Sequence, residues 1–171
     1  EVFVSYPDQA LVVRLTADAP GALSLQARLT RGPNNRHFDE IRKLDDAAIV
    51  MRGQTGGGGP RFRTVVRALT EGGKLSVVGE RIVVEGADAA TFVVAAATSF
   101  RFDDPEAEAV RAAREASERG CVSLRERHAA DVSALMERVC LRLPSSPERE
   151  ALPTDERLRL VREGQEDCGL A

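Results

Sequence analysis

Alternating apolar and polar residues dominate the first part of the chain and predict β-structure. From position 23 to position 30, Leu or Ala occupies every second position, with Ser, Gln, Arg and Thr between them. Successive strand side chains point to opposite faces, so this segment predicts a strand with one buried and one solvated face. The run Leu11–Leu15 is almost continuously apolar, which is typical of a strand covered on both sides.

Short strands separated by turns continue to about residue 102. Further strands are expected at 48–52, 61–69, 75–78, 81–85 and 91–100. The Gly72–Gly73 and Gly79–Glu80 pairs predict tight hairpins, because primed turns need positive φ values. The glycine-rich stretch 53–60 predicts a flexible hairpin connection, since a phosphate-binding loop would continue through Lys and Ser or Thr into a helix. Together these features predict that residues 1–102 are part of an antiparallel β-sandwich.

Charged residues interrupt the strand pattern over positions 31–46 and predict a long loop or insertion. This segment contains four carboxylates: Asp39, Glu40, Asp45 and Asp46. A hydrolytic pair needs a defined separation and one raised pKa, whereas these acids are interleaved with basic residues. They therefore favour a solvated surface over an active site.

A second charged feature is the arginine stripe at positions 61, 63 and 67, which alternates with apolar Phe62, Val66 and Ala68. A single basic strand in a net-acidic chain favours a solvent face, or a face that meets an acidic neighbouring domain, over nucleic-acid binding.

The pattern becomes helical after Asp103. Asp104 is a candidate N-cap, Pro105 suits the first turn, and Gly120 marks a helix end. A second helix is expected from about residue 123 to 139, with its apolar stripe packed on the β layer of the chain. The stripe consists of Leu124, His128, Val132, Leu135, Met136 and Val139. His128 is interpreted as a packing residue rather than a catalyst.

A last helix is expected over 155–164, capped by Thr154 and preceded by a short extended piece at 141–143. Its apolar face offers Leu158 and Val161. Isolated helices of this length are marginal, so residues 154–171 are expected to pack against a partner outside this chain.

Composition narrows the function without assigning one. The net charge of −3 gives no general attraction to nucleic acid, and no apolar run approaches the roughly 20 residues of a membrane span. Cys121, Cys140 and Cys168 lack metal-ligand spacing and are predicted to be free thiols, and His37 lies far along the chain from His128. No catalytic, cofactor-binding or metal residue is assigned, no cofactor is expected, and the compartment stays open.

Five blocks in sequence order carry a family resemblance. They are SYPDQALVVRLTADAPGALSLQARL, then VMRGQ with PRFRTVVRAL, then EGADAATFVVAAATSF, then LRERHAADVSALMERVCLRL, then LPTDERLRLVREG. The series resembles the N-terminal region of glycoside hydrolase family 95, the inverting α-L-fucosidases and their relatives. Two departures are Cys121, where relatives tend to have an aromatic residue, and a long, polar 31–46 segment.

The resemblance implies an N-terminal β-sandwich, a helical linker, an (α/α)6 catalytic barrel and a C-terminal β domain. Residues 1–102 then correspond to the later part of the sandwich, and residues 103–171 to the linker. The family's acid and base lie in the barrel, so no catalytic residue is carried over. The chain opens on Glu1 in mid-strand pattern and is expected to be a fragment.

The implied full-length protein hydrolyses terminal fucosyl or related residues of glycans. Its partners are the barrel of the same polypeptide and the glycan substrate. The alternative is a free-standing carbohydrate-binding or protein-interaction module, against which the absence of Trp counts.

Overall fold

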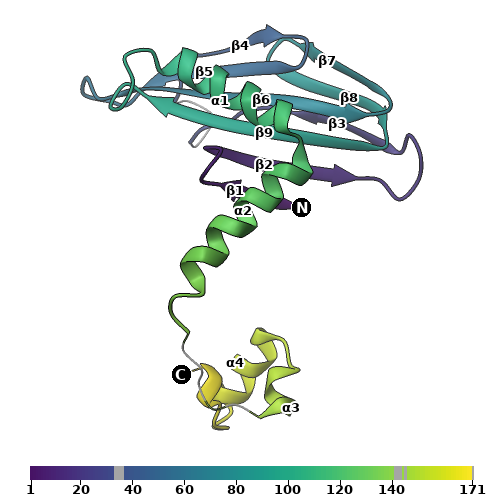
Figure 1. The fold of residues 1–171 in the computed structure, drawn as a ribbon, viewed down its shortest axis with the longest axis vertical. Helices are drawn as coiled ribbons and strands as arrows, with labels where there is room; N and C mark the ends of the chain where they lie inside the picture. The colour runs from purple at the N-terminus through teal and green to yellow at the C-terminus, as the bar shows by residue number, and fades with distance from the viewer. Residues whose placement is uncertain (33–36, 141–143, 145, 171) are drawn as a thin grey trace. The chain divides into compact units, whose positions relative to one another are not determined.

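The structure is a computed structural model that describes all residues except 33–36, 141–143, 145 and 171 (Figure 1). The extended piece expected at 141–143 lies outside the described residues. Residues 1–133 and 134–171 form two compact units, which are described separately. No helix in the described part of the chain is long and apolar enough to span a membrane.

The first unit contains two antiparallel sheets. The larger sheet has the strand order β1 (Val2–Ser5), β2 (Ala10–Thr16), β9 (Ala89–Thr98), β6 (Arg61–Glu71), β5 (Ala48–Gln54) and β4 (Glu40–Asp45). The smaller sheet has the order β3 (Leu23–Ala27), β8 (Arg81–Ala87) and β7 (Lys74–Val78). The structure thus confirms a mainly β fold with helices near the C-terminal end (Figure 1).

The main core lies between the two sheets. Its largest members include Ile49 and Ile82, both fully buried, and Phe92. The smaller sheet contacts strands β4, β5 and β6, so it covers only part of the larger one. On the same face of β1 and β2, Val2, Val4 and Leu15 are 65%, 58% and 36% exposed. This end of the larger sheet therefore presents an open apolar surface.

Strand β4 corrects the expectation that 31–46 is entirely loop. Residues Glu40–Asp45 pair with β5, and Ile41 is buried in the main core. The charged residues of this strand do not share one face: Arg42 points to the outer face, where it bonds a glutamate of the first helix, whereas Lys43 is on the same face as Ile41 and lies opposite Ile49. Positions 33–36 of the expected loop lie outside the described residues.

The glycine turns give a mixed result. Gly79–Glu80 joins the paired strands β7 and β8, and 53–60 joins the paired strands β5 and β6, as predicted. Gly72–Gly73 does not close a hairpin ladder, because β6 pairs with β5 and β9 while β7 pairs with β8. Both glycines have positive φ, and the turn carries the chain from one sheet to the other.

Helix α1 (Pro105–Arg119) packs on the outer face of the larger sheet, across β6 and β9 (Figure 1). The Asp104 side chain caps it by accepting from the backbone N–H groups of Glu106 and Ala107, and Gly120 ends it at φ 78°, as predicted. Four of its six buried residues are Ala, and these small side chains let it lie close to Val50, Val65, Ala95 and Ala97.

Helix α2 (Cys121–Met136) corrects the expected packing of the second helix. Leu124 is its one buried residue, whereas Val132, Leu135 and Met136 are 40%, 58% and 69% exposed, and Val139 beyond its end is 82% exposed. His128 is a packing residue as interpreted, because its ring stacks on Phe3 at a centroid distance of 5.4 Å. The sequence stripe therefore exists, but the β layer covers only its first turns.

The second unit contains α3 (Pro147–Glu150), α4 (Thr154–Arg162) and the short 3-10 helix η2 (Cys168–Leu170). Thr154 is the first residue of α4 rather than its cap; the cap position is Pro153, which offers no side-chain hydrogen bond. Leu158 and Val161 are 44% and 41% exposed. Arg157 anchors the end of this unit through two hydrogen bonds to Asp167, of 2.7 and 2.9 Å.

Candidate functional site

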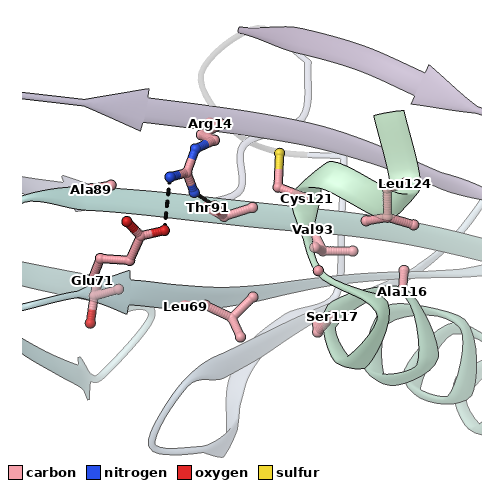
Figure 2. Close-up of a pocket in the computed structure, with 12 residues that line it drawn as sticks. Arg14, Leu69, Glu71, Ala89, Thr91, Val93, Ala116, Ser117, Cys121 and Leu124 are labelled. Atoms are coloured by element: carbon pink, nitrogen blue, oxygen red, sulfur yellow. Dashed lines mark hydrogen bonds and ion pairs between the residues drawn. The ribbon is translucent and has the colours of Figure 1, made fainter. Parts of the chain in front are cut away.

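A cleft of about 240 Å³ lies between strands β2, β6 and β9 and the corner where α1 meets α2 (Figure 2). Its polar rim carries Arg14, Glu71 and Thr91. Val93, Ala116 and Leu124 form an apolar floor. From α1 the lining residues are the small side chains Ala116 and Ser117, whereas the sheet contributes Leu69 and Val93.

The polar groups of the cleft satisfy one another. Arg14 donates to Glu71 Oε1 at 2.8 Å and to Thr91 Oγ1 at 3.0 Å (Figure 2). The hydrogen bond to Glu71 is the main cause that raises the pKa of Arg14 above its ordinary value. Glu71 is the one carboxylate among the described residues that line the cleft. This described lining therefore contains no pair of carboxylates of the kind that glycoside hydrolysis uses.

A second charged cluster fixes the beginning of α1. Glu106 accepts hydrogen bonds of 2.6 Å from Arg52 and 2.7 Å from Arg42, and its carboxylate lies 3.4 Å from Arg63 Nε. Bonds from Arg52, and then from Arg42, lower the pKa of Glu106. The three arginines come from β5, β4 and β6, so one carboxylate ties the helix to three strands.

This cluster changes the interpretation of the arginine stripe. Arg63 is only 17% exposed at its side chain because α1 covers it, and Arg67 pairs with Asp45. Arg61 stays exposed beside the start of α1. The stripe therefore meets acidic residues of its own chain at two of its three positions.

The four loop acids are not arranged as a catalytic pair. Glu40 pairs with Arg52 at 3.2 Å, Asp45 with Arg67, and Asp46 with Lys43 at 2.5 Å. The hydrogen bond from Lys43 lowers the pKa of Asp46, whereas a general acid needs a raised pKa. Asp39 is exposed at the end of the preceding loop.

A third charged cluster, not predicted from the sequence, is centred on Asp8 in the turn between β1 and β2. Asp8 accepts from Ser5 Oγ at 2.6 Å and from Arg127 Nε at 2.9 Å, and its Oδ1 lies 3.3 Å from Arg119 Nε. Its side chain is only 2% exposed. The two arginines come from the end of α1 and from α2, so Asp8 contacts both helices at the corner where they meet.

The three cysteines are free, as predicted. Cys121 is half-buried and lines the cleft from the first turn of α2 (Figure 2). Cys140 and Cys168 are exposed. In the described ranges, no three His, Cys, Asp or Glu side chains lie close enough to hold a metal ion.

Comparison with known families matches two regions of the chain. Residues 1–103 match the model described as glycosyl hydrolase family 65, N-terminal domain, and residues 120–171 match the one described as glycosyl hydrolase family 95 catalytic domain. The sequence has no significant match among curated proteins. These matches identify the two regions as parts of a glycoside hydrolase. The match to family 95 lies in the second region, whereas the β domain, expected to resemble family 95, matches the family 65 N-terminal domain. Helix α1 lies between the two.

Proposed function

The chain belongs to the glycosyl hydrolase family 65 N-terminal domain family, and on this premise we propose that it is the non-catalytic N-terminal portion of an enzyme resembling the inverting α-L-fucosidases. The proposed parent hydrolyses terminal fucosyl or related residues of glycans. The role of this portion is to build the N-terminal β domain and to carry the chain into the catalytic barrel.

The observation that carries this proposal is the order of the two family matches. An N-terminal domain at 1–103 precedes a catalytic-domain match at 120–171 on one polypeptide. The charged clusters support a non-catalytic role for this portion, because Glu71, Glu106 and Asp8 are each paired with arginines.

The exposed apolar residues support docking on the barrel. Val132, Leu135 and Met136 lie at helical spacing and are each at least 40% exposed. Burying a large apolar side chain yields roughly 1.5–3 kcal/mol, so a partner surface that covers these residues would be favoured. The proposed partner is the catalytic barrel of the same polypeptide.

The test compares the 171-residue chain with a polypeptide extended by the downstream coding sequence. We expect the extended protein to hydrolyse an aryl α-L-fucoside and the 171-residue chain to be inactive. Proton NMR of the first product formed should show inverted anomeric configuration. The matched controls are Asp39→Asn, Glu40→Gln, Asp45→Asn and Asp46→Asn in the short chain.

Turnover by the short chain that disappears in one of these variants would contradict the proposal. A coding sequence without a downstream barrel, together with glycan binding by the short chain, would replace it with the free-standing module. Activity of the extended protein on a different glycoside would support the glycoside hydrolase function and contradict the proposed preference for fucosyl residues.

A further inference from the structure

The boundary between the two matched regions coincides with the corner between α1 and α2. The second matched region begins at residue 120, and Gly120, at φ 78°, is where the chain changes direction. Helix α2 is therefore the first element of the catalytic-domain region. Through residue 133 it belongs to the same compact unit as the β-sheets.

Apolar packing does little to fix the direction of α2. Leu124 is its one buried residue, and His128 adds a ring contact with Phe3. Val122 and Val132 are 63% and 40% exposed. Apolar contacts are also non-directional, so two such contacts leave the angle of a helix weakly determined.

Asp8 supplies directional contacts at this corner. Its carboxylate, held by Ser5, meets Arg119 from the last turn of α1 and Arg127 from α2. We propose that Asp8 is the positioning residue of the joint between α1 and α2, and that it sets the direction in which α2 leaves the β-sheets. That α2 begins a catalytic region rests on the proposed function; the contacts of Asp8 with the two helices do not.

The burial of Asp8 makes these contacts obligatory. A carboxylate that is 2% exposed loses its hydration and must receive hydrogen bonds from the protein. Bonds between arginine and carboxylate are charge-assisted and depend on angle, so they restrict orientation as well as distance. The neighbouring Arg125–Glu1 pair is exposed and longer, at 3.7 Å, and adds little.

The experiment is hydrogen exchange on the 171-residue chain, with site-resolved alkylation of Cys121 as a second readout. Asp8→Asn is compared with Asp46→Asn, which removes an exposed turn carboxylate that pairs with Lys43 nearby in sequence. For Asp8→Asn we expect exchange of the α2 amides at 125–133 to be about tenfold faster, equivalent to about 1.4 kcal/mol of local opening. Amides of β2, β9 and α1 should keep their protection, and Cys121 should alkylate faster.

The variant Arg127→Gln distinguishes loosening of α2 from destabilisation of the sheet, because it leaves the Ser5–Asp8 hydrogen bond intact. We expect amide exchange to increase as much as in Asp8→Asn, and only in α2. Exchange in α2 equal to that of Asp46→Asn would overturn the proposal. Loss of protection throughout the sheets in both Asp8→Asn and Arg127→Gln would also overturn it, because Asp8 would then stabilise the whole unit. Neither result involves hydrolysis, so neither bears on the proposed function.

Discussion

Two turn glycines of the smaller sheet show how one residue can have two separate reasons to be glycine. Gly73 and Gly79 have nearly the same φ, 65° and 58°. A Cβ on Gly79 would meet nothing within 4 Å, whereas one on Gly73 would overlap the carbonyl oxygen of Glu85 and lie 2.6 Å from Ala87 N. Gly79 is thus required by backbone conformation alone, and Gly73 by conformation and by close approach to β8.

These surroundings predict different costs for the same substitution. Gly79→Ala should destabilise the protein by about 1–2 kcal/mol, the cost of a left-handed conformation for a residue with a Cβ. Gly73→Ala should cost a further ~1–3 kcal/mol, because backbone atoms of β8 must move. Urea unfolding of both variants measures the difference. Equal costs would mean that β8 is not packed against this turn.

At the scale of elements, α1 is held to the sheet by a face of small apolar residues and by one glutamate in its first turn. Ala residues face the sheet, and Glu106 bonds arginines of neighbouring strands. The folded-state pKa of Glu106 lies below its ordinary value of 4.5. A depressed carboxyl pKa contributes stability above pH 4.5, and the contribution disappears as the pH falls through the folded value.

Glu106→Gln should therefore lower the free energy of unfolding at pH 7 by about 1.5–3 kcal/mol, the range for hydrogen bonds to charged groups. Below pH 4.5 the difference from the unsubstituted protein should shrink. The control is Glu108→Gln, which removes a pair with Arg111 on the same helix and should cost at most about 0.5 kcal/mol. Urea midpoints measured from pH 7 to pH 3 test this, and a pH-independent difference would contradict it.

Elements with regular periodicity could be predicted from the sequence, and elements whose polar residues have distant partners could not. The continuous apolar run of β9 and the Asp104–Pro105 start of α1 were predicted correctly. Strand β4 was missed because Arg42 and Lys43 look like loop residues until Glu106, far along the chain, is placed beside Arg42. The available signal was the set of apolar residues Phe38, Ile41 and Leu44 within a charged run.

The turn at Gly72–Gly73 shows a second reason why a prediction from sequence can fail. A hairpin and a crossing between sheets both need positive φ, so the dipeptide predicts the turn and not the pairing of the strands beside it. Asp8 shows the same limit for the candidate joint. Nothing local distinguishes it from an ordinary turn aspartate, because its partners Arg119 and Arg127 lie more than 100 residues away.

At the scale of the whole molecule, the described part of the tail, residues 154–170, has little burial of its own. Leu158 and Val161 are more than 40% exposed, and α4 is shorter than the ~12–15 residues at which isolated helices become marginal. Amides at 158–163 should therefore exchange faster in the 171-residue chain than in the extended parent. Amides of β9 are the internal control and should be equal in both. Equal protection at 158–163 would show that the tail needs no further partner.

The pairing of β2 with β9 has a consequence for synthesis of the chain. These neighbours in the larger sheet are separated by about 70 residues, which a ribosome adding ~5–20 residues per second makes in roughly 4–15 s. During that interval β2 has been synthesised without β9, the strand that pairs with it on the side away from β1. The larger sheet can close only after β9 leaves the exit tunnel. The apolar residues of β1 and β2 are thus available to chaperones throughout translation of the strands between them.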